Sequence, residues 1–147
     1  MIKTKATGPI PPGYSAIDGE LAIGGQKASA LVAENGSPLF VYSSSRLDAR
    51  MAQLRTAMPD ALDLHYAMKA NPFPPLLRHM VGLADGIDIA SGGELRMALD
   101  AGAAAEHISF AGPGKRDDEL EQAIRAGVTG RYGSARTSAQ RHGLPSG

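Results

Sequence analysis

The spacing of hydrophobic and polar residues divides the first part of the chain into strand and helix patterns. Residues 16–25 alternate in polarity and contain Asp-Gly and Gly-Gly pairs, which predicts a short strand or a hairpin. Residues 26–36 predict a helix that is closed by Gly36 at its C-terminal end. A continuous apolar run after a proline predicts a strand over residues 37–45.

A regular succession of helix and strand patterns follows. Leu47, Met51, Leu54 and Met58 lie at helical spacing and predict a helix that is stopped by Pro59. Three strand patterns then each precede a helix pattern, over 62–69 and 74–83, 86–91 and 92–102, and 107–112 and 116–127. A repeated short strand, loop and helix is typical of βαβ units with a parallel sheet.

This succession predicts the α/β fold class. Lys69, Ser91 and Gly112 end the three predicted strands at near-equal intervals. We interpret the pattern as the N-terminal part of a (β/α)8 TIM barrel, truncated after about the third or fourth βα unit. A doubly wound open sheet is the alternative, because half a barrel and an open sheet give the same sequence pattern.

The pattern stops after Val128. Residues 129–147 contain no acidic residue and, apart from alanine, a single aliphatic one, Leu144. A barrel needs at least about 200 residues, so we favour a missing continuation, through truncation or a shifted reading frame, over a disordered basic tail. The expected organisation is an N-terminal segment with a helix and a contribution to a β-domain (1–36), a partial barrel (37–128) and that tail.

Composition excludes several classes of function. The 15 Lys and Arg residues balance 15 Asp and Glu residues, which argues against nucleic acid or an anionic membrane as partner. The chain has no cysteine, which excludes disulfides and thiolate metal sites and fits a cytoplasmic protein. No segment approaches the roughly 18 apolar residues of a membrane helix. The four histidines have no metal-ligand spacing, so no metal is expected.

Lys69 is the first candidate for chemistry. Side chains alternate along a strand, so Lys69 and Ala67 would point into the barrel, at the carboxyl end where barrel active sites lie. Asp88 takes the same face of the next predicted strand. A buried salt bridge without function gives little net stability, whereas a desolvated lysine is what Schiff-base chemistry requires. Periodicity alone leaves both interpretations open.

Two further motifs are explained by local structure on spacing alone. Ser91 and Glu94 lie at capping-box spacing before an apolar helix pattern. The segment AGPGKR (111–116) lacks the Ser or Thr and the first glycine of a P-loop, so Lys115 is expected to be a loop lysine or a solvated charge. His65 is expected to pack inside the barrel.

Three motifs together resemble a known family. YAMKANP (66–72), DIASGGEL (88–95) and SFAGPGKRDDEL (109–120) resemble, in this order and spacing, the fold type III pyridoxal-phosphate-dependent decarboxylases. This group includes the diaminopimelate, ornithine and arginine decarboxylases. The resemblance runs from about residue 9 to Val128. The residues of the three motifs are most similar to those of the decarboxylase that is associated with the exosortase A system of exopolysaccharide-producing bacteria.

The resemblance implies an alanine-racemase-like barrel and roles for four residues. Lys69 corresponds to the lysine that forms the Schiff base with pyridoxal 5'-phosphate, and Ala67 to the small residue behind the cofactor ring. Asp88 corresponds to the acid near the lysine and the cofactor. Glu94 corresponds to a family glutamate close to the same site, in addition to its capping role. The expected partners are a small amino-acid substrate, basic or acidic, and a second copy in a homodimer of the full-length family member.

The resemblance also implies groups that this chain lacks. In the family, the glycine-rich phosphate site, the histidine on the ring, the acid on the pyridine nitrogen and the cysteine-bearing dimer segment come from later strands, and none matches residues 129–147. We therefore expect the N-terminal part of a decarboxylase, a carboxy-lyase that is inactive as this chain alone. The alternative is a truncated non-catalytic remnant or a weak cofactor-binding module. A cofactor-homeostasis protein is disfavoured by the segment IDGELAIGG, which belongs with a two-domain architecture.

Overall fold

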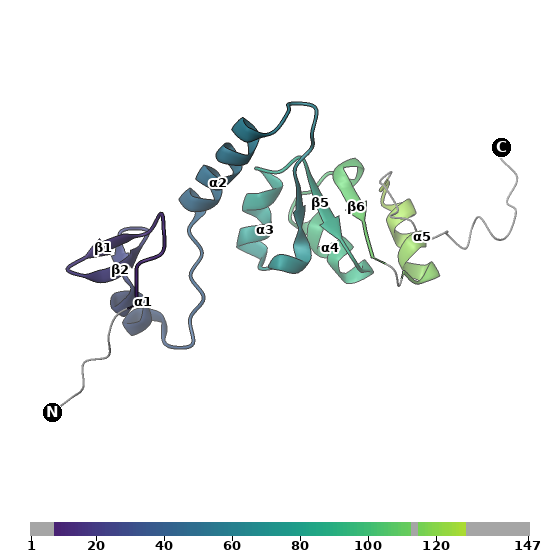
Figure 1. The fold of residues 1–147 in the computed structure, drawn as a ribbon. Coiled ribbons are helices and arrows are strands. Elements are labelled where there is room, and N and C mark those ends of the chain that lie inside the picture. The colour runs from purple at the N-terminus through teal and green to yellow at the C-terminus, as the bar shows by residue number, and fades with distance from the viewer. Residues whose placement is uncertain (1–7, 113–114, 129–147) are drawn as a thin grey trace, which may run out of the picture. The chain divides into compact units, whose positions relative to one another are not determined.

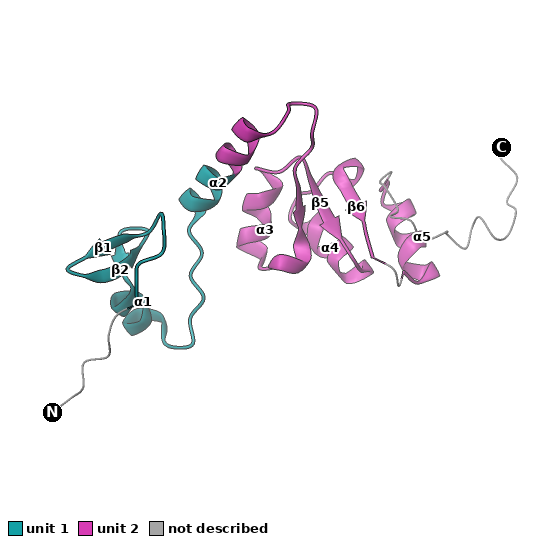
Figure 2. Cartoon of the chain, in the orientation of Figure 1, with its two compact units in different colours: residues 1–50 teal, residues 51–147 magenta. Residues whose placement is uncertain are grey.

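The computed structural model describes residues 8–112 and 115–128 of the chain. The chain divides into two compact units, residues 1–50 and residues 51–147 (Figure 2). The tail that the sequence predicts over residues 129–147 lies outside the described residues.

The first unit contains a small antiparallel sheet. β1 (Ser15–Ile17) pairs with β2 (Glu20–Ile23), and β2 pairs with β3 (Gln26–Lys27). Asp18 and Gly19 turn the first hairpin with φ angles of 52° and 75°, the left-handed region that an Asp-Gly pair adopts readily. The predicted hairpin is confirmed, with a third short strand beside it.

The segment after this sheet agrees with the sequence only in part. α1 (Ala28–Asn35) ends as predicted at Gly36, whose φ of 82° suits a residue without a Cβ atom. The predicted strand over residues 37–45 is wrong, since residues 37–43 form neither strand nor helix and Phe40 is 83% exposed. A strand needs a neighbour for its backbone hydrogen bonds, and the described part of the chain offers this segment none.

α2 (Ser44–Ala57) ends before Pro59, as predicted. The second unit then continues with a parallel sheet whose strands alternate with helices (Figure 1). Its elements are β4 (His65–Ala67), the 3-10 turn η1 (Met68–Ala70), α3 (Pro74–Val81), β5 (Gly86–Ile89), α4 (Gly92–Asp100), the 3-10 turn η2 (Ala105–His107), β6 (Ile108–Phe110) and α5 (Asp117–Arg125). The strand order is β4-β5-β6, so the predicted βα succession is confirmed.

One face of this sheet forms the core of the second unit. Ile87, Ile89, Ile108 and Phe110 are each at most 2% exposed. They form one hydrophobic cluster with side chains of α3, α4 and α5, namely Leu77, Leu95, Ala98 and Ala123. Each large apolar side chain that is buried in this way contributes roughly 1.5–3 kcal/mol. The opposite face, here called the inner face, carries His65, Ala67, Asp88 and Ser109.

Gly86 is required by close packing at the start of β5. A Cβ atom at this position would lie 2.5 Å from the backbone oxygen of His107 and 2.5 Å from Cε1 of His65. We expect Gly86→Ala to lower the free energy of unfolding by about 1–3 kcal/mol, the usual cost of overpacking. Urea unfolding followed by circular dichroism measures this change.

Gly93→Ala is the matched control. The nearest atom to a Cβ at Gly93 lies 3.7 Å away, and the residue is inside α4, where alanine is the better helix former. The control should be neutral or more stable than the wild type by up to about 1 kcal/mol. Equal stability of the two variants would contradict the close packing at Gly86.

Candidate functional site at the carboxyl edge of the sheet

Lys69 lies just beyond β4 rather than in the strand. Strand β4 ends at Ala67, and Lys69 belongs to η1, so the predicted strand over 62–69 is too long. The Tyr66 hydroxyl donates to the carbonyl of Asn71 at 2.9 Å, which closes a tight turn at the strand end. The resulting geometry keeps Lys69 at the carboxyl edge of the sheet, defined by the ends of β4, β5 and β6.

The environment of Lys69 differs from the expected one. The side chain is exposed rather than desolvated, and it forms no hydrogen bond or ion pair with any residue that the structure describes. The neighbouring residue Met68 is fully buried instead, so the apolar side of the turn faces the core. An exposed primary amine is accessible to a ligand at this edge.

Asp88 lies in the middle of a polar row across the inner face. The strand register pairs Ala67 with Asp88 and Asp88 with Ser109. The Ser109 hydroxyl donates to Oδ1 of Asp88, and Nδ1 of His65 lies 3.2 Å from the same oxygen. The salt bridge between Lys69 and Asp88, one of the two interpretations that the sequence left open, is therefore not formed in the part of the chain that the structure describes. The structure brings Ala67 and Asp88 together and adds two polar neighbours that sequence reasoning did not assign to Asp88.

Glu94 holds the backbone of the turn after β5. The Ser91 hydroxyl accepts the amide N–H of Glu94 at 3.2 Å, which confirms the serine half of the predicted capping box. The Glu94 carboxylate accepts the amide N–H of Ala90 at 2.6 Å, one residue before the position that a capping box would use. Glu94 is therefore placed on the turn that begins two residues after Asp88.

Lys115 is a loop residue, as predicted, but its ammonium group has partners. Its Nζ donates to the carbonyl of Gly112 at 2.9 Å and lies 5.6 Å from the centre of the Phe110 ring. The second unit therefore has one lysine tied to its own loop and another, Lys69, exposed at the same edge of the sheet.

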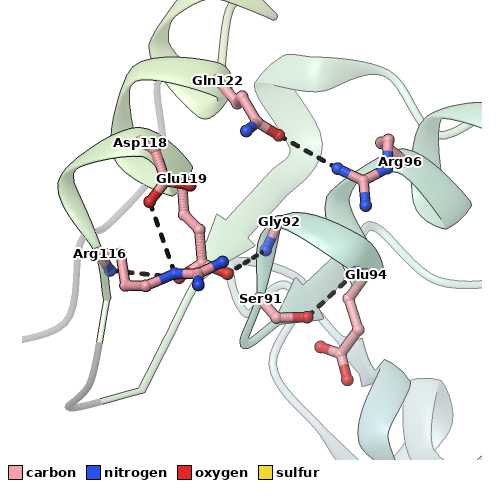
Figure 3. A network of polar contacts seen from close by, with 8 residues as sticks. All are labelled: Ser91, Gly92, Glu94, Arg96, Arg116, Asp118, Glu119 and Gln122. Carbon is pink, nitrogen blue, oxygen red and sulfur yellow. Dashed lines mark hydrogen bonds and ion pairs between the residues drawn. The ribbon is translucent and has the colours of Figure 1, made fainter.

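Glu119 is a buried charged residue that sequence reasoning missed. Among the residues that the structure describes, Glu119 is the only charged residue that is buried, with 8% of it exposed. Its carboxylate accepts the amide N–H of Gly92 at 2.9 Å and that of Arg116 at 3.2 Å (Figure 3). The available signal was its position one helical turn before the buried Ala123, because a carboxylate on the apolar side of a helix needs partners.

The electrostatics of Glu119 follow from these contacts. The Gly92 N–H and then the Arg116 N–H hold the pKa of the Glu119 carboxyl below its ordinary value of 4.5, and the charge of the Arg116 guanidinium adds to this, while burial acts in the opposite direction. The group is therefore ionised at neutral pH.

A cavity of about 690 Å³ lies at the other end of the strands from Lys69. Its polar lining comes from Asp63, His65, Asp85, Glu106, His107 and Ser109. The Asp85 carboxylate there already binds the Arg55 guanidinium and the amide N–H of Leu64, and the arginine is the larger cause of its lowered pKa. Active sites of (β/α) barrels lie at the carboxyl ends of the strands, so the candidate site is the edge with Lys69.

Comparison with known proteins identifies the family. Residues 44–135, more than half of the chain, match the family model of the pyridoxal-dependent decarboxylases, pyridoxal binding domain. The chain belongs to this family. Pyridoxal phosphate is therefore the cofactor that the matched domain implies. In the part of this family member that the structure describes, no helix is long and apolar enough to cross a membrane.

Curated relatives are similar over most of this chain but over a small part of their own length. Diaminopimelate decarboxylase of Aquifex aeolicus is 46% identical over 107 residues, which cover 73% of this chain and 25% of the relative. L-glutamyl-[BtrI acyl-carrier protein] decarboxylase of Niallia circulans is 35% identical over 100 residues, which cover 68% of this chain and 23% of the relative. The chain thus spans about a quarter of the length of the curated relatives that it matches.

Solved structures decide the architecture. The crystal structure of AQ1208 from Aquifex aeolicus matches with a TM-score of 0.72 and 42% identity, over 80% of this chain and 29% of that one. Diaminopimelate decarboxylase of M. jannaschii matches with a TM-score of 0.66 and 28% identity, over 77% of this chain and 28% of that one. These neighbours are TIM-barrel proteins, so the predicted N-terminal part of a barrel is confirmed and the doubly wound alternative is not needed.

The side chains at the carboxyl edge fit one end of this cofactor. The aldehyde of pyridoxal phosphate requires an accessible amine, and Lys69 presents one. Ala67 leaves room next to Asp88 on the inner face, and Asp88 is held by two neighbours. The cofactor fit therefore rests on an amine, a small residue and an oriented carboxylate within two adjacent βα units.

The two contacts of Glu119 predict a pH-dependent contribution to stability. A carboxyl whose pKa is lowered on folding stabilises the native state above its unfolded pKa, and this contribution is lost as the pH falls through the folded pKa. Glu119→Gln should therefore be less stable than the wild type at neutral pH, and the difference should shrink once the pH drops below 4.5. The unfolding midpoints of the wild type and of Glu119→Gln, measured at several pH values from neutral to pH 3, give this stability difference.

Glu121→Gln is the control for the loss of one charge on the same helix. Glu121 is exposed and binds Arg125 at 3.3 Å on the surface. Its variant should show only a small stability change. A stability difference between wild type and Glu119→Gln that grows as the pH falls would contradict the assigned contacts.

Proposed function

We propose that this chain is the N-terminal part of a pyridoxal-phosphate-dependent amino-acid decarboxylase, with Lys69 as the residue to which the cofactor is attached. The observation that carries the proposal is the exposed amine of Lys69 at the carboxyl edge, inside the segment that matches the pyridoxal binding domain. In this proposal, residues 37–128 form the barrel part and residues 1–36 contribute to a separate β-domain.

Each proposed residue has a role that its surroundings support. Lys69 supplies the nucleophilic nitrogen, and Ala67 gives the cofactor ring room above β4. Asp88 supplies a carboxylate whose orientation is set by its contacts with His65 and Ser109. When bound, pyridoxal phosphate supplies an electron-withdrawing ring that takes up the electrons left by a departing carboxylate.

Glu94 is proposed as the second acid of the cofactor site. Its carboxylate binds the amide N–H of Ala90, so it already lies on the turn that follows Asp88. A carboxylate that accepts a single backbone hydrogen bond keeps acceptor capacity for a ligand.

The substrate, the assembly and the location of the whole protein are part of the same proposal. An amino acid, basic or acidic, is the proposed substrate, supported by the many diaminopimelate decarboxylases among the relatives. The amino-acid sequence of the motifs around Lys69, Asp88 and Ser109 supports membership of the exosortase-associated branch, which is linked to exopolysaccharide production. We propose a cytoplasmic homodimer for the full-length enzyme, with the neutral charge balance and the absence of cysteine in this chain as support for the location.

Covalent labelling tests the role of Lys69. Pyridoxal 5'-phosphate added to the purified chain should give an absorbance band that borohydride makes permanent, and peptide mapping by mass spectrometry should place the label on Lys69. Lys69→Ala should abolish both the band and the label. The physical reason is that the exposed amine of Lys69 is open to the aldehyde.

Lys115→Ala is the matched control, because Lys115 lies at the same edge but its Nζ is bound to the Gly112 carbonyl. This variant should keep the band and the label at Lys69. Labelling spread evenly over the lysines, or unchanged in Lys69→Ala, would refute the proposal. Labelling at Lys69 without decarboxylation by any longer form of the chain would favour a cofactor-binding module or a non-catalytic remnant.

A further inference from the structure

We infer that Glu119 is a positioning residue of the cofactor site, because its single carboxylate joins two neighbouring βα turns at the carboxyl edge. The inference rests on the function proposed above. It concerns a residue that touches neither Lys69 nor Asp88 and acts through the backbone of the turns beside them.

The two hydrogen bonds of Glu119 start from different turns. Gly92 is the first residue of α4 and belongs to the turn after β5, while Arg116 immediately precedes α5 and belongs to the turn after β6. Oε1 of Glu119 accepts from the first amide and Oε2 from the second, so both oxygens are used (Figure 3). Barrel active sites are built from these βα turns, and the carboxylate of Glu119 hydrogen-bonds to both of them here.

The electrostatics of the two helices favour this arrangement. The first amides of a helix have no partner inside the helix, and the N-terminal end carries a partial positive charge. The Glu119 carboxylate meets such an end at both α4 and α5. An ionised carboxylate therefore gains from both helices, whereas a neutral amide side chain would have one acceptor oxygen for two donors.

Gly92 lies close to side chains of α5. A Cβ atom at Gly92 would lie 3.3 Å from Cγ of Glu119 and 3.3 Å from Oε1 of Gln122, which is tighter than usual. Arg96 donates to the same Gln122 oxygen at 3.2 Å, a second link between α4 and α5 (Figure 3). The first residue of α4 is thus hydrogen-bonded to α5, with too little space between them for an additional methyl group without a small shift.

The consequence for the cofactor site concerns Glu94. Three backbone groups of the β5–α4 turn are held by side chains: the Ala90 amide by Glu94, the Glu94 amide by Ser91, and the Gly92 amide by Glu119. If the Glu94 carboxylate turns to a ligand, the Ala90 amide loses its partner. The bonds from Ser91 and Glu119 then still keep the turn, and with it the end of the strand that carries Asp88, in place.

Cofactor affinity and local hydrogen exchange separate this role from simple packing. Glu119→Gln and the control Glu121→Gln are titrated with pyridoxal 5'-phosphate at a temperature where circular dichroism shows each variant to be folded. We expect Glu119→Gln to bind the cofactor about tenfold more weakly, as for the loss of one charge-assisted hydrogen bond. Hydrogen–deuterium exchange should become faster in peptides from residues 88–95 and 115–120, and not in the core strand 108–110.

A second variant covers the case in which Glu119→Gln is poorly folded. Gly92→Ala leaves Glu119 in place, adds a methyl group against its Cγ, and introduces the better helix former at the first residue of α4. Gly92→Ala, like Glu119→Gln, should bind the cofactor more weakly than the wild type. Its melting temperature should fall less than that of Glu119→Gln.

The outcomes distinguish the inference from the function on which it depends. Cofactor binding that is equal in the wild type, Glu119→Gln and Gly92→Ala would overturn the positioning role and leave the proposed function standing. Exchange that is accelerated evenly over the whole second unit, with unchanged affinity of the folded fraction, would also overturn it. A wild-type chain that shows no Lys69-dependent band would overturn the proposed function itself, and the inference with it.

Discussion

Burial of one face of the parallel sheet against three helices is the constraint on which the second unit depends. Ile87, Ile89, Ile108 and Phe110 fill that face, and the alternation of a strand then forces Asp88 and Ser109 to the other side. Because the strands are parallel, their carboxyl ends lie at one edge, and the turns to the following helices meet there. The same packing that stabilises the unit therefore gathers its polar side chains at one edge and on one face.

Carboxylates bind backbone amides that this architecture leaves without partners. Every turn from a strand to a helix exposes backbone amides that the helix itself cannot satisfy. Glu94 and Glu119 bind such amides at the turns after β5 and β6, and Ser91 binds one more. Acidic residues next to this edge thus have a structural use that is independent of chemistry. A glutamate there can serve both roles only if other side chains can hold the turn, which is the arrangement found around Gly92.

The contrast between two lysines shows how the fold selects a residue for function. Lys69 and Lys115 both follow strands of the same sheet and both lie at its carboxyl edge. The ammonium group of Lys115 is bound to the carbonyl of Gly112 and faces the Phe110 ring, whereas Lys69 is exposed in a tight turn. Both residues are lysines after a strand of this sheet, so their availability is set by the local backbone and by the groups around them.

Sequence alone determined the order of the three βα units, their approximate bounds and the face of each of their strands. The helix before Pro59 and the three βα units follow from apolar spacing, because burial of a helix or a strand requires that spacing. The motifs around Lys69, Asp88 and Glu94 led to the family to which the chain belongs, and the position of Asp88 on the inner face follows from strand alternation. These features depend on residues close together in the chain.

Only the tertiary structure decided which groups meet. The apolar run at residues 39–42 reads as a strand, yet a strand exists only where a second one pairs with it. Asp88 binds His65 and Ser109 rather than Lys69, because the register of three strands sets its neighbours and the tight turn carries Lys69 beyond the sheet. Glu119 reaches Gly92, 27 residues earlier, because α4 and α5 lie side by side. Contacts between distant segments depend on the packing of whole elements, which no local pattern encodes.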